Sequence, residues 1–381
     1  MLIDSTLREG EQRFGAYFSA QAKHAVLDRV AAVGVEEIEA GCAGRCPDTP
    51  ALVARARAMF DAEGRGRAVS VWCAARKPDL ELALSMRPHR VCLGLPVSDA
   101  HIEKRLKTTR ADILNRLTGL LRHARALGAA YISVGLEDAS RADPDFALDV
   151  ARLAQDEGAA RVRLSDTVGI LSPGETTALV GRFVNALCIP VAVHCHDDFG
   201  LATANALAAL DAGAAFADCA ALGIGERAGI AATERLAAYL SLRRGAGYDL
   251  AALAPLCATV AETLGERVPP HAPVVGERLF WVESGLHADA QYKCSSLYEP
   301  FPPETLGLTR RIALGKKSGN AAVRAKLAEL GVAEPADLDR LTRTIRAAAG
   351  TKGDALDDAE IPELASVDAE AGLSPHPAAP A

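Results

Sequence analysis

The sequence from R-V-R-L-S-D at residues 161–166, through Ser172-Pro173, to V-A-V-H-C-H at residues 191–196 predicts one complete strand–helix–strand unit. The outer two segments are short runs with β-branched and apolar residues, which is typical of buried strands. The middle segment begins with Ser172-Pro173, which places proline at the first position of a helix. Parallel strands joined by helices are the repeating unit of α/β folds.

The same alternation recurs through most of the chain. We predict strands at Leu2–Thr6, Glu37–Gly41, Val69–Cys73, Arg90–Leu95, Tyr131–Gly135, Arg161–Asp166, Val191–His196 and Phe216–Leu222. Between them we predict helices that include Ser19–Val33, Ala111–Leu127, Asp145–Glu157 and Thr203–Ala212. Eight units in roughly 245 residues favour a closed (β/α)8 TIM barrel, an α/β fold. The alternative, a doubly wound open sheet, would carry a glycine-rich phosphate-binding motif after the first strand, where this sequence has none.

The pattern changes at the proline-rich stretch E-R-V-P-P-H-A-P, residues 266–273. We therefore predict a TIM-barrel catalytic domain over residues 1–265 and a stiff, extended linker over residues 266–281. A small, mostly helical subdomain is expected over residues 282–355. The composition from there on is dominated by Ala, Pro, Glu and Ser, so we expect residues 356–381 to be a disordered tail.

The bulk composition excludes several classes of protein. The 381 residues are 49% hydrophobic, which suffices for a large core, and the formal net charge is −7 with both signs mixed along the chain. A nucleic-acid-binding protein would show clustered positive charge. No apolar run approaches the roughly 18–20 residues of a membrane span. The nine cysteines follow no disulfide framework, and no second pair joins Cys42 and Cys46 to complete a zinc site. We expect a soluble, cytoplasmic protein.

Polar residues gather where two of the predicted strands end. The first strand continues into D-S-T-L-R-E-G-E-Q at residues 4–12, and the seventh ends in H-C-H-D-D at residues 194–198. In a TIM barrel the catalytic groups lie at these carboxyl ends. Alternation along a strand puts His194 and His196 on one side, and two imidazoles near a carboxylate suit a divalent metal. The simpler interpretation is one structural and one exposed histidine.

Four motifs carry a resemblance to a known superfamily. They are D-S-T-L-R-E-G-E-Q at residues 4–12, S-D-T-V-G at 165–169, H-C-H-D-D-F-G at 194–200 and G-I-G-E-R-A-G-I at 223–230. Their sequence and order resemble the superfamily of homocitrate synthases, isopropylmalate synthases and pyruvate-carboxylase-like aldolases, and the match extends to about residue 319. The resemblance implies a Claisen condensation of acetyl-CoA with a 2-oxo acid. It also implies that Glu9, His194 and His196 bind a divalent ion (Mg, Mn, Zn or Co) and that Arg8 stabilises the enolate oxygen.

The resemblance also suggests roles for residues outside the metal site. His287, in S-G-L-H-A-D at residues 284–289, matches the catalytic histidine, and Tyr298 follows at the expected spacing. In the family this pair reaches into the barrel of a partner subunit, which implies a homodimer. Gln12 and Thr167 match family residues that hold the substrate carboxylate and order the metal site. Position at the predicted strand ends, rather than the resemblance, adds Glu137 for catalysis and Glu39 and His101 for substrate contact. The simpler interpretation is that His287 caps a helix, Tyr298 packs, and polar rim residues are merely solvated.

Finer features favour one member of the superfamily. Glutamate at position 9 resembles homocitrate synthases. The stretches V-S-V-W-C at residues 69–73, P-V-S-D at 96–99 and I-S-V-G-L-E-D-A-S-R-A-D-P-D-F at 132–146 resemble the nitrogen-fixation type of that enzyme, which implies 2-oxoglutarate as the acceptor. The arginine that the lysine-pathway type places on the fifth strand is absent, and Ser133 and Gly135 stand there instead.

Three positions depart from the family pattern. Asp197 replaces an asparagine beside the second histidine and adds negative charge there, Ile230 stands where several relatives have an asparagine, and Lys317 replaces a histidine in G-K-K-S-G at residues 315–319. These departures leave three alternatives open. The chain is another 2-oxo-acid synthase, making citramalate or isopropylmalate, or a lyase or aldolase of the superfamily, or a barrel without activity. The lyases usually carry a cysteine in the glycine loop, whereas G-I-G-E-R at residues 223–227 has none.

Overall fold

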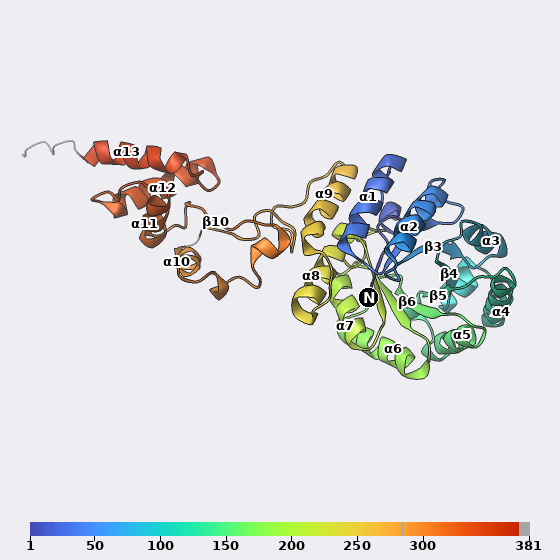
Figure 1. The fold of residues 1–381 in the computed structure, drawn as a ribbon. Coiled ribbons are helices and arrows are strands. Elements are labelled where there is room, and N and C mark those ends of the chain that lie inside the picture. The colour runs from blue at the N-terminus through green and yellow to red at the C-terminus, as the bar shows by residue number, and fades with distance from the viewer. Residues whose placement is uncertain (284, 373–381) are drawn as a thin grey trace, which may run out of the picture. The chain divides into compact units, whose positions relative to one another are not determined.

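The computed structural model describes residues 1–283 and 285–372. Its first part is a closed barrel in which each strand pairs in parallel with the next and β8 pairs with β1 (Figure 1). The strands are β1 Leu2–Asp4, β2 Glu37–Cys42, β3 Ala68–Ala74, β4 Arg90–Pro96, β5 Ile132–Glu137, β6 Arg161–Asp166, β7 Val191–Cys195 and β8 Phe216–Cys219. The predicted (β/α)8 TIM barrel is confirmed.

Helices surround the barrel and follow the predicted order. They are α1 Ala20–Val33, α2 Thr49–Glu63, α3 Lys77–Ser85, α4 Arg110–Ala126, α5 Pro144–Asp156, α6 Pro173–Ala186, α7 Ala202–Asp211, α8 Thr233–Arg244 and α9 Leu253–Thr263. Helix α6 begins at Pro173, as predicted, and Ser172 and Glu175 form a reciprocal capping box at its start. Helix α1 begins after Ser19, which accepts the N–H of Ala22, and ends at Gly34 with φ 90°.

Three predicted strands are too long at their carboxyl ends. Strand β1 ends at Asp4 because the Ser5 carbonyl accepts the N–H groups of Arg8, Glu9 and Gly10, which winds the chain into a tight turn. Strand β7 ends one residue before His196. Strand β8 ends at Cys219, and Leu222 adopts φ 57° in the following short helical turn. Of the predicted strand residues that lie beyond the observed ends, His196 is one of the candidate metal ligands.

The interior of the barrel holds two layers of charge. Successive inward positions of β2 and β6, which lie opposite each other in a ring of eight strands, are both charged. We call Glu37, Arg90 and Arg161 the inner layer, and Glu39, Arg163 and Asp218, one step nearer the carboxyl ends, the outer layer. In the inner layer Arg161 Nη1 lies 2.7 Å from Glu37 Oε2, and in the outer layer Arg163 Nη1 lies 2.7 Å from Asp218 Oδ2. TIM barrels more often fill this space with bulky apolar side chains.

A second compact unit begins at Pro269, inside the predicted linker. Its two short strands, β9 Trp281–Val282 and β10 Arg311–Ile312, pair in parallel, and its helices are α10 Gly285–Lys293, α11 Asn320–Glu329, α12 Leu338–Lys352 and α13 Glu360–Gly372. The predicted mostly helical C-terminal region is therefore present. Its core contains Leu314, Val323, Leu341, Ile345 and Ile361.

Two predictions about the second unit are wrong. The segment after Pro269 is not extended, because it folds into consecutive turns in which Gly276 N–H donates to the Ala272 carbonyl. A Cβ at residue 276 would lie 2.5 Å from the Ala272 nitrogen, so this folding depends on glycine. The tail is not disordered up to residue 372, since α13 forms and buries Ile361 fully. The rest of the predicted tail, residues 373–381, lies outside the described residues.

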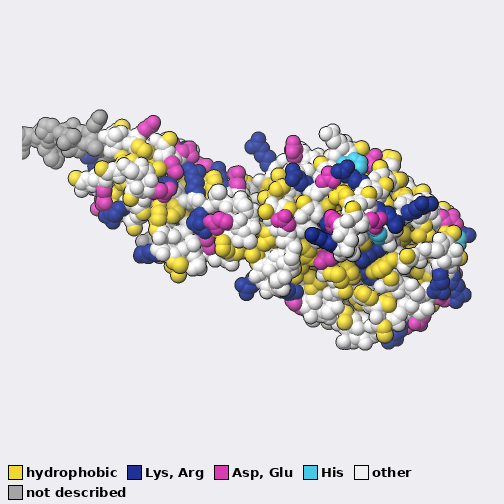
Figure 2. Space-filling model, in the orientation of Figure 1, with side chains coloured by type: hydrophobic (Ala, Val, Ile, Leu, Met, Phe, Trp, Pro, Cys, Tyr) yellow, Lys and Arg dark blue, Asp and Glu magenta, His cyan; other side chains and the backbone are white. Residues whose placement is uncertain are grey.

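Charged side chains of both signs are interspersed with apolar atoms over the face shown in Figure 2. Among the described residues, no helix combines the length and the apolar composition needed to cross a membrane.

Candidate active site

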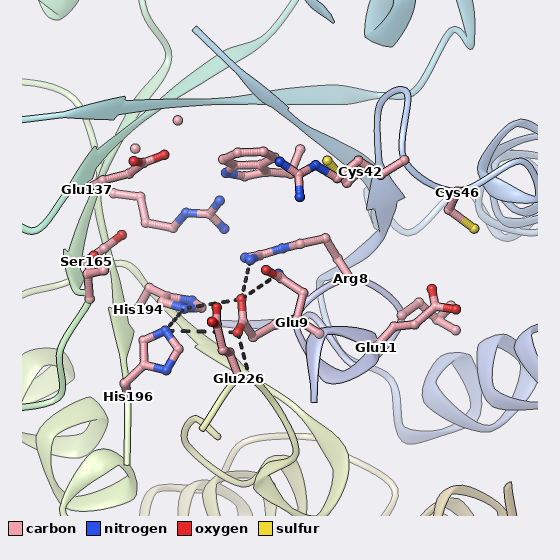
Figure 3. Close-up of a pocket in the computed structure, with 18 of the residues that line it drawn as sticks. Arg8, Glu9, Glu11, Cys42, Cys46, Glu137, Ser165, His194, His196 and Glu226 are labelled. Atoms are coloured by element: carbon pink, nitrogen blue, oxygen red, sulfur yellow. Dashed lines mark hydrogen bonds and ion pairs between the residues drawn. The ribbon is translucent and has the colours of Figure 1, made fainter. Parts of the chain in front are cut away.

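Three potential metal ligands converge at the mouth of the barrel. Glu9 comes from the turn after β1, His194 from β7 and His196 from the position after it, and all three are buried. One donor atom from each lies within 4.8 Å of the other two. The Nε2 atoms of His194 and His196 are 3.4 Å apart, and Glu9 oxygens lie 3.9 and 4.0 Å from them. Figure 3 shows the three side chains pointing toward one another.

The outer hydrogen bonds fix how the two imidazoles face this point. His194 Nδ1 lies 2.8 Å from the Asp218 carboxylate, and His196 Nδ1 lies 3.1 Å from the Gly229 carbonyl. Both partners only accept, so each Nδ1 carries a hydrogen and each Nε2 presents a lone pair inward. Burial, together with the neighbouring His194, lowers the pKa of His196 to about 4, so this imidazole is neutral at neutral pH. Two lone pairs and a carboxylate facing one point fit a divalent cation.

Glu9 is held as an ionised carboxylate by its neighbours. Burial would raise its pKa, but the positive charge of Arg8 lowers it below the usual range. Arg8 Nη1 is paired with Glu9, and Gln12 Nε2 donates to Glu9 Oε2 at 3.1 Å. The N–H of Glu226 donates to Glu9 Oε1 at 3.2 Å. The tight turn after β1 thus brings the guanidinium and the carboxylate side by side at the mouth.

The metal-binding candidates lie in the wall of a cavity of about 540 Å³. The wall also includes Trp72 of β3 and Glu137 of β5, and Glu137 pairs with Arg105 at 2.6 Å. Gly94 of β4 makes room for them, because a Cβ at residue 94 would overlap the Trp72 ring and lie 2.6 Å from Glu137 Oε1. The cavity is large enough for a small organic acid beside a metal ion.

Comparison with known proteins identifies the family to which this chain belongs. Residues 1–260 match the HMGL-like family, and residues 274–353 match the homocitrate synthase post-HMGL domain-like family. The chain belongs to the HMGL-like family.

Curated relatives of this HMGL-like chain include synthases with different named products. Homocitrate synthase 1 of Nostoc sp. is 38% identical over 334 residues, which cover 87% of each chain. The 2-isopropylmalate synthase 2 of Caldanaerobacter subterraneus subsp. tengcongensis is 37% identical over 332 residues, which cover 87% of this chain and 85% of the relative. Among solved structures, the hydroxymethylglutaryl-CoA lyase of Pseudomonas aeruginosa aligns with a TM-score of 0.60 at 25% identity, covering 70% of this chain and 93% of that one. The chain is therefore an enzyme, an acyltransferase that condenses acetyl-CoA with a 2-oxo acid.

The structure brings most of the predicted barrel residues into one cavity. Its walls include Arg8, Glu9, Gln12, Glu137, Thr167, His194 and His196. Thr167, after β6, also accepts the N–H of Asp138 at 2.8 Å through its hydroxyl, which ties the ends of β5 and β6 together.

Two predicted substrate contacts of the HMGL-like barrel lie elsewhere. Glu39 is fully buried beneath Arg8, where it accepts hydrogen bonds from Ser5 at 2.8 Å and Arg8 at 2.5 Å, so it acts on the arginine rather than on substrate. His101 lies in the π-helical turn Ala100–Arg105 and its Nε2 is 3.8 Å from Asp138, outside the cavity wall. Position at a strand end did not reveal whether these side chains face the cavity.

The two candidates of the second unit lie together within that unit. The rings of His287 and Tyr298 are stacked with centroids 4.3 Å apart, and both residues are exposed. His287 lies on α10, so it does not cap the start of that helix. Residue 284, the first of the motif that contains His287, lies outside the described residues.

The three departures from the family pattern are placed as follows. Asp197 Oδ1 accepts the N–H of Ala202 at 2.7 Å, so its carboxylate caps the start of α7 and is not one of the three converging donors. Ile230 is buried and bridges to His196 through the backbone. Lys317 is exposed, and its N–H donates to Glu283 at 3.0 Å.

Sequence reasoning missed three residues that shape the site: Arg163, Asp218 and Trp72. Arg163 and Trp72 line the cavity, and Asp218 orients His194. A signal was present, because charged residues two positions apart on β2 and β6 must both face inward if one of them does. The partner of each inward-facing charged residue depends on which strands lie opposite each other in the closed barrel. The sequence of a single strand does not contain this information.

Proposed function

We propose that this enzyme is a homocitrate synthase, which condenses acetyl-CoA with 2-oxoglutarate in a metal-assisted Claisen reaction and then hydrolyses the thioester. The coarser activity, addition of the acetyl group of acetyl-CoA to a 2-oxo acid, is that of the synthase class to which the chain belongs. The observation that carries the proposal is the placement of Arg8 directly beside the Glu9–His194–His196 cluster in one cavity.

The residues of the site have distinct roles in this reaction. A divalent cation held by Glu9, His194 and His196 would polarise the keto group of the 2-oxo acid and orient its carboxylate. Arg8 forms its two ion pairs through Nε and Nη1, and among the described residues its Nη2 has no hydrogen-bond partner. That group can donate to the oxygen of the acetyl group as it becomes an enolate. The side chains of Arg8 and Glu9 are only 9% and 4% exposed.

The charge of the cavity supports an acceptor with two carboxylates. Four glutamates line it, against six cationic side chains: Arg8, Lys23, Arg45, Arg105, Arg163 and Arg227. Strand β5 has Ser133 and Gly135 where the lysine-pathway type has an arginine, and Ser133 is fully buried and accepts a hydrogen bond from Arg161 at 3.0 Å. We therefore assign recognition of the far carboxylate of 2-oxoglutarate to the more exposed cations at the cavity edge, of which Arg105 lies nearest Glu137.

We further propose that the catalytic base comes from a second copy of the chain, through His287 and Tyr298. The mouth of the barrel carries exposed aromatic side chains, since Phe14 and Tyr17 after β1 are 102% and 88% exposed and Phe199 after β7 is 72% exposed. On the second unit, Leu297 and Tyr298 are also exposed, at 62% and 52%. Large exposed apolar side chains of this kind often mark an interface, and a homodimer would cover both sets.

A panel of acceptors tests the proposed substrate. Purified protein, acetyl-CoA and a divalent metal are combined with 2-oxoglutarate, pyruvate or 2-oxoisovalerate, and release of the CoA thiol is followed. We expect 2-oxoglutarate to give the highest kcat/KM and a chelator to abolish turnover. A tenfold faster reaction with pyruvate or 2-oxoisovalerate would replace homocitrate by citramalate or isopropylmalate as the product. The identity to the isopropylmalate synthase is 37%, against 38% to the homocitrate synthase, so isopropylmalate is the second candidate product.

A further inference from the structure

A closed circuit of polar side chains runs from the metal-binding cluster through the barrel interior and back. His194 Nδ1 contacts Asp218 at 2.8 Å, Asp218 contacts Arg163 at 2.7 Å, and Arg163 contacts Glu39 at 3.1 Å. Glu39 then contacts Arg8 at 2.5 Å, Arg8 pairs with Glu9, and Glu9 Oε2 lies 3.9 Å from His194 Nε2. Each of the six side chains therefore contacts two other members of the circuit.

Arg163 is the centre of the buried half of this circuit. It is 2% exposed, and its Nη1 is shared between the carboxylates of Glu39 and Asp218. Burial would lower the pKa of Arg163, but Asp218 and Glu39 raise it well above its usual range, so the guanidinium is always charged. A planar guanidinium holds its partners in a fixed fork, which a flexible ammonium cannot do. Movement of Arg163 would displace both carboxylates together.

Each of those carboxylates orients a group of the reaction. Asp218 keeps the hydrogen of His194 on Nδ1, which leaves Nε2 free as a metal ligand. Glu39 holds Nε of Arg8, which determines where the rest of that guanidinium points. We propose that Arg163 is a positioning residue that couples the metal ligand His194 to the enolate-stabilising Arg8. This inference rests on the proposed metal role of the cluster, and it does not depend on which 2-oxo acid is the substrate.

The inner layer supplies a matched control. Arg161 lies two residues earlier on the same strand, is fully buried and pairs with Glu37 at 2.7 and 3.0 Å. Among the described residues it forms no hydrogen bond or ion pair with the metal-binding cluster or with Arg8. Arg161→Gln and Arg163→Gln thus remove the same charge from the same strand. Each leaves buried carboxylates that keep another partner: Glu37 keeps Arg90, Glu39 keeps Arg8, and Asp218 keeps His194. A general loss of stability affects both variants, whereas coupling to the metal affects only the second.

Cobalt binding to the chelator-stripped protein is the decisive measurement, because its visible absorption also reports ligand geometry. Removal of a nearby positive charge would by itself tighten cation binding. Positioning predicts the opposite, so we expect Arg163→Gln to weaken Co²⁺ binding by about 10–100-fold and to change the spectrum. Arg161→Gln should leave Co²⁺ affinity within about threefold of the wild type. Unchanged or tighter binding in Arg163→Gln, or equal weakening in both variants, would overturn the proposal.

Two further variants complete the test. Arg163→Lys keeps the charge without the fork, so it should also weaken Co²⁺ binding, and it serves if Arg163→Gln does not fold. If Arg163 acts through Asp218, the double variant Arg163→Gln/Asp218→Asn should bind Co²⁺ no more weakly than Asp218→Asn alone. Additive losses would contradict that route. A wild-type protein that binds no divalent metal would remove the proposed function and this inference together, whereas normal wild-type binding with an unaffected Arg163→Gln removes only the inference.

Discussion

At the scale of single residues, the two imidazoles of the cluster are oriented by different acceptors. His194 donates to a carboxylate, whereas His196 donates to the backbone carbonyl of Gly229. A carboxylate partner makes an imidazole a stronger ligand than a carbonyl partner does. His196 also lies just after β7, on a connection that bridges to Ile230, so the loop after β8 sets its position. The two ligands therefore depend on different parts of the barrel.

Substitution of His196 tests the metal site at this scale. His196→Ala removes one of three donors without disturbing the β7 ladder, so the protein should stay folded and lose divalent-metal binding and at least about 100-fold in activity. Metal content after dialysis, a circular dichroism melt and the thiol-release assay measure the three quantities. A variant that retains full chelator-sensitive activity would exclude His196 as a ligand.

Residue types alone predicted part of the site. The H-x-H motif and the acidic residue after Arg8 identified the three donors, because adjacent strand ends meet at one rim. Residue types do not distinguish side chains that face the cavity from side chains buried beneath it. Glu39 was therefore predicted as a substrate contact although it is fully buried. The direction of a side chain after a strand depends on the turn that follows, as the turn at Ser5 shows.

At the scale of elements, the cavity depends on two adjacent strands. Gly94 of β4 and Gly135 of β5 are paired partners in the sheet, yet their surroundings differ. A Cβ at residue 94 would overlap Trp72, whereas a Cβ at residue 135 would meet its nearest atom, the Leu93 carbonyl oxygen, at 3.6 Å, an ordinary contact. The same substitution on neighbouring strands should therefore have different effects.

Gly94→Ala should destabilise the protein by about 1–3 kcal/mol and raise the KM for the 2-oxo acid, because Trp72 must move into the cavity. The control Gly135→Ala should change the unfolding free energy by less than about 0.5 kcal/mol. Urea unfolding and acceptor kinetics measure both effects. A smaller ring in the double variant Gly94→Ala/Trp72→Phe should recover part of the lost stability. Equal effects at the two glycines would show that Trp72 does not fill the space beside Gly94.

The order and type of the barrel elements followed from local patterns, and the ends of the elements did not. Helix starts with a clear side-chain signal were accurate, as at Ser172-Pro173, because the capping interaction is local. Helix α13 was missed because its composition resembles a disordered segment. It forms because Ile361 finds a core made by residues that precede it in the chain, such as Leu314 and Val323.

At the scale of the whole molecule, complementation tests whether the active site is shared between two subunits of a dimer. Arg8→Ala damages the barrel and His287→Ala damages the second unit, so each homodimer should be inactive. After subunit exchange, about half of the dimers should be mixed, and each should regain one working site, since the two lesions then fall in the same site. Turnover near a quarter of the wild-type value is expected in the thiol-release assay.

A second mixture serves as the control. Arg8→Ala and His196→Ala both damage the barrel, so their mixed dimers contain no intact barrel and should stay inactive. If the first mixture also stays inactive despite proven heterodimers, His287 acts in its own chain or has no catalytic role.

The two layers of charge inside the barrel have a calorimetric consequence. Unfolding a protein usually raises the heat capacity by about 12–15 cal/mol/K per residue, because apolar surface becomes hydrated, whereas hydration of polar surface lowers it. The inner and outer layers place arginines and carboxylates where barrels usually hold aliphatic side chains. The heat capacity of the first unit should therefore increase less per residue on unfolding than that of a barrel with an aliphatic interior. Its stability would then vary less steeply with temperature, and the slope of calorimetric enthalpy against melting temperature measures this directly.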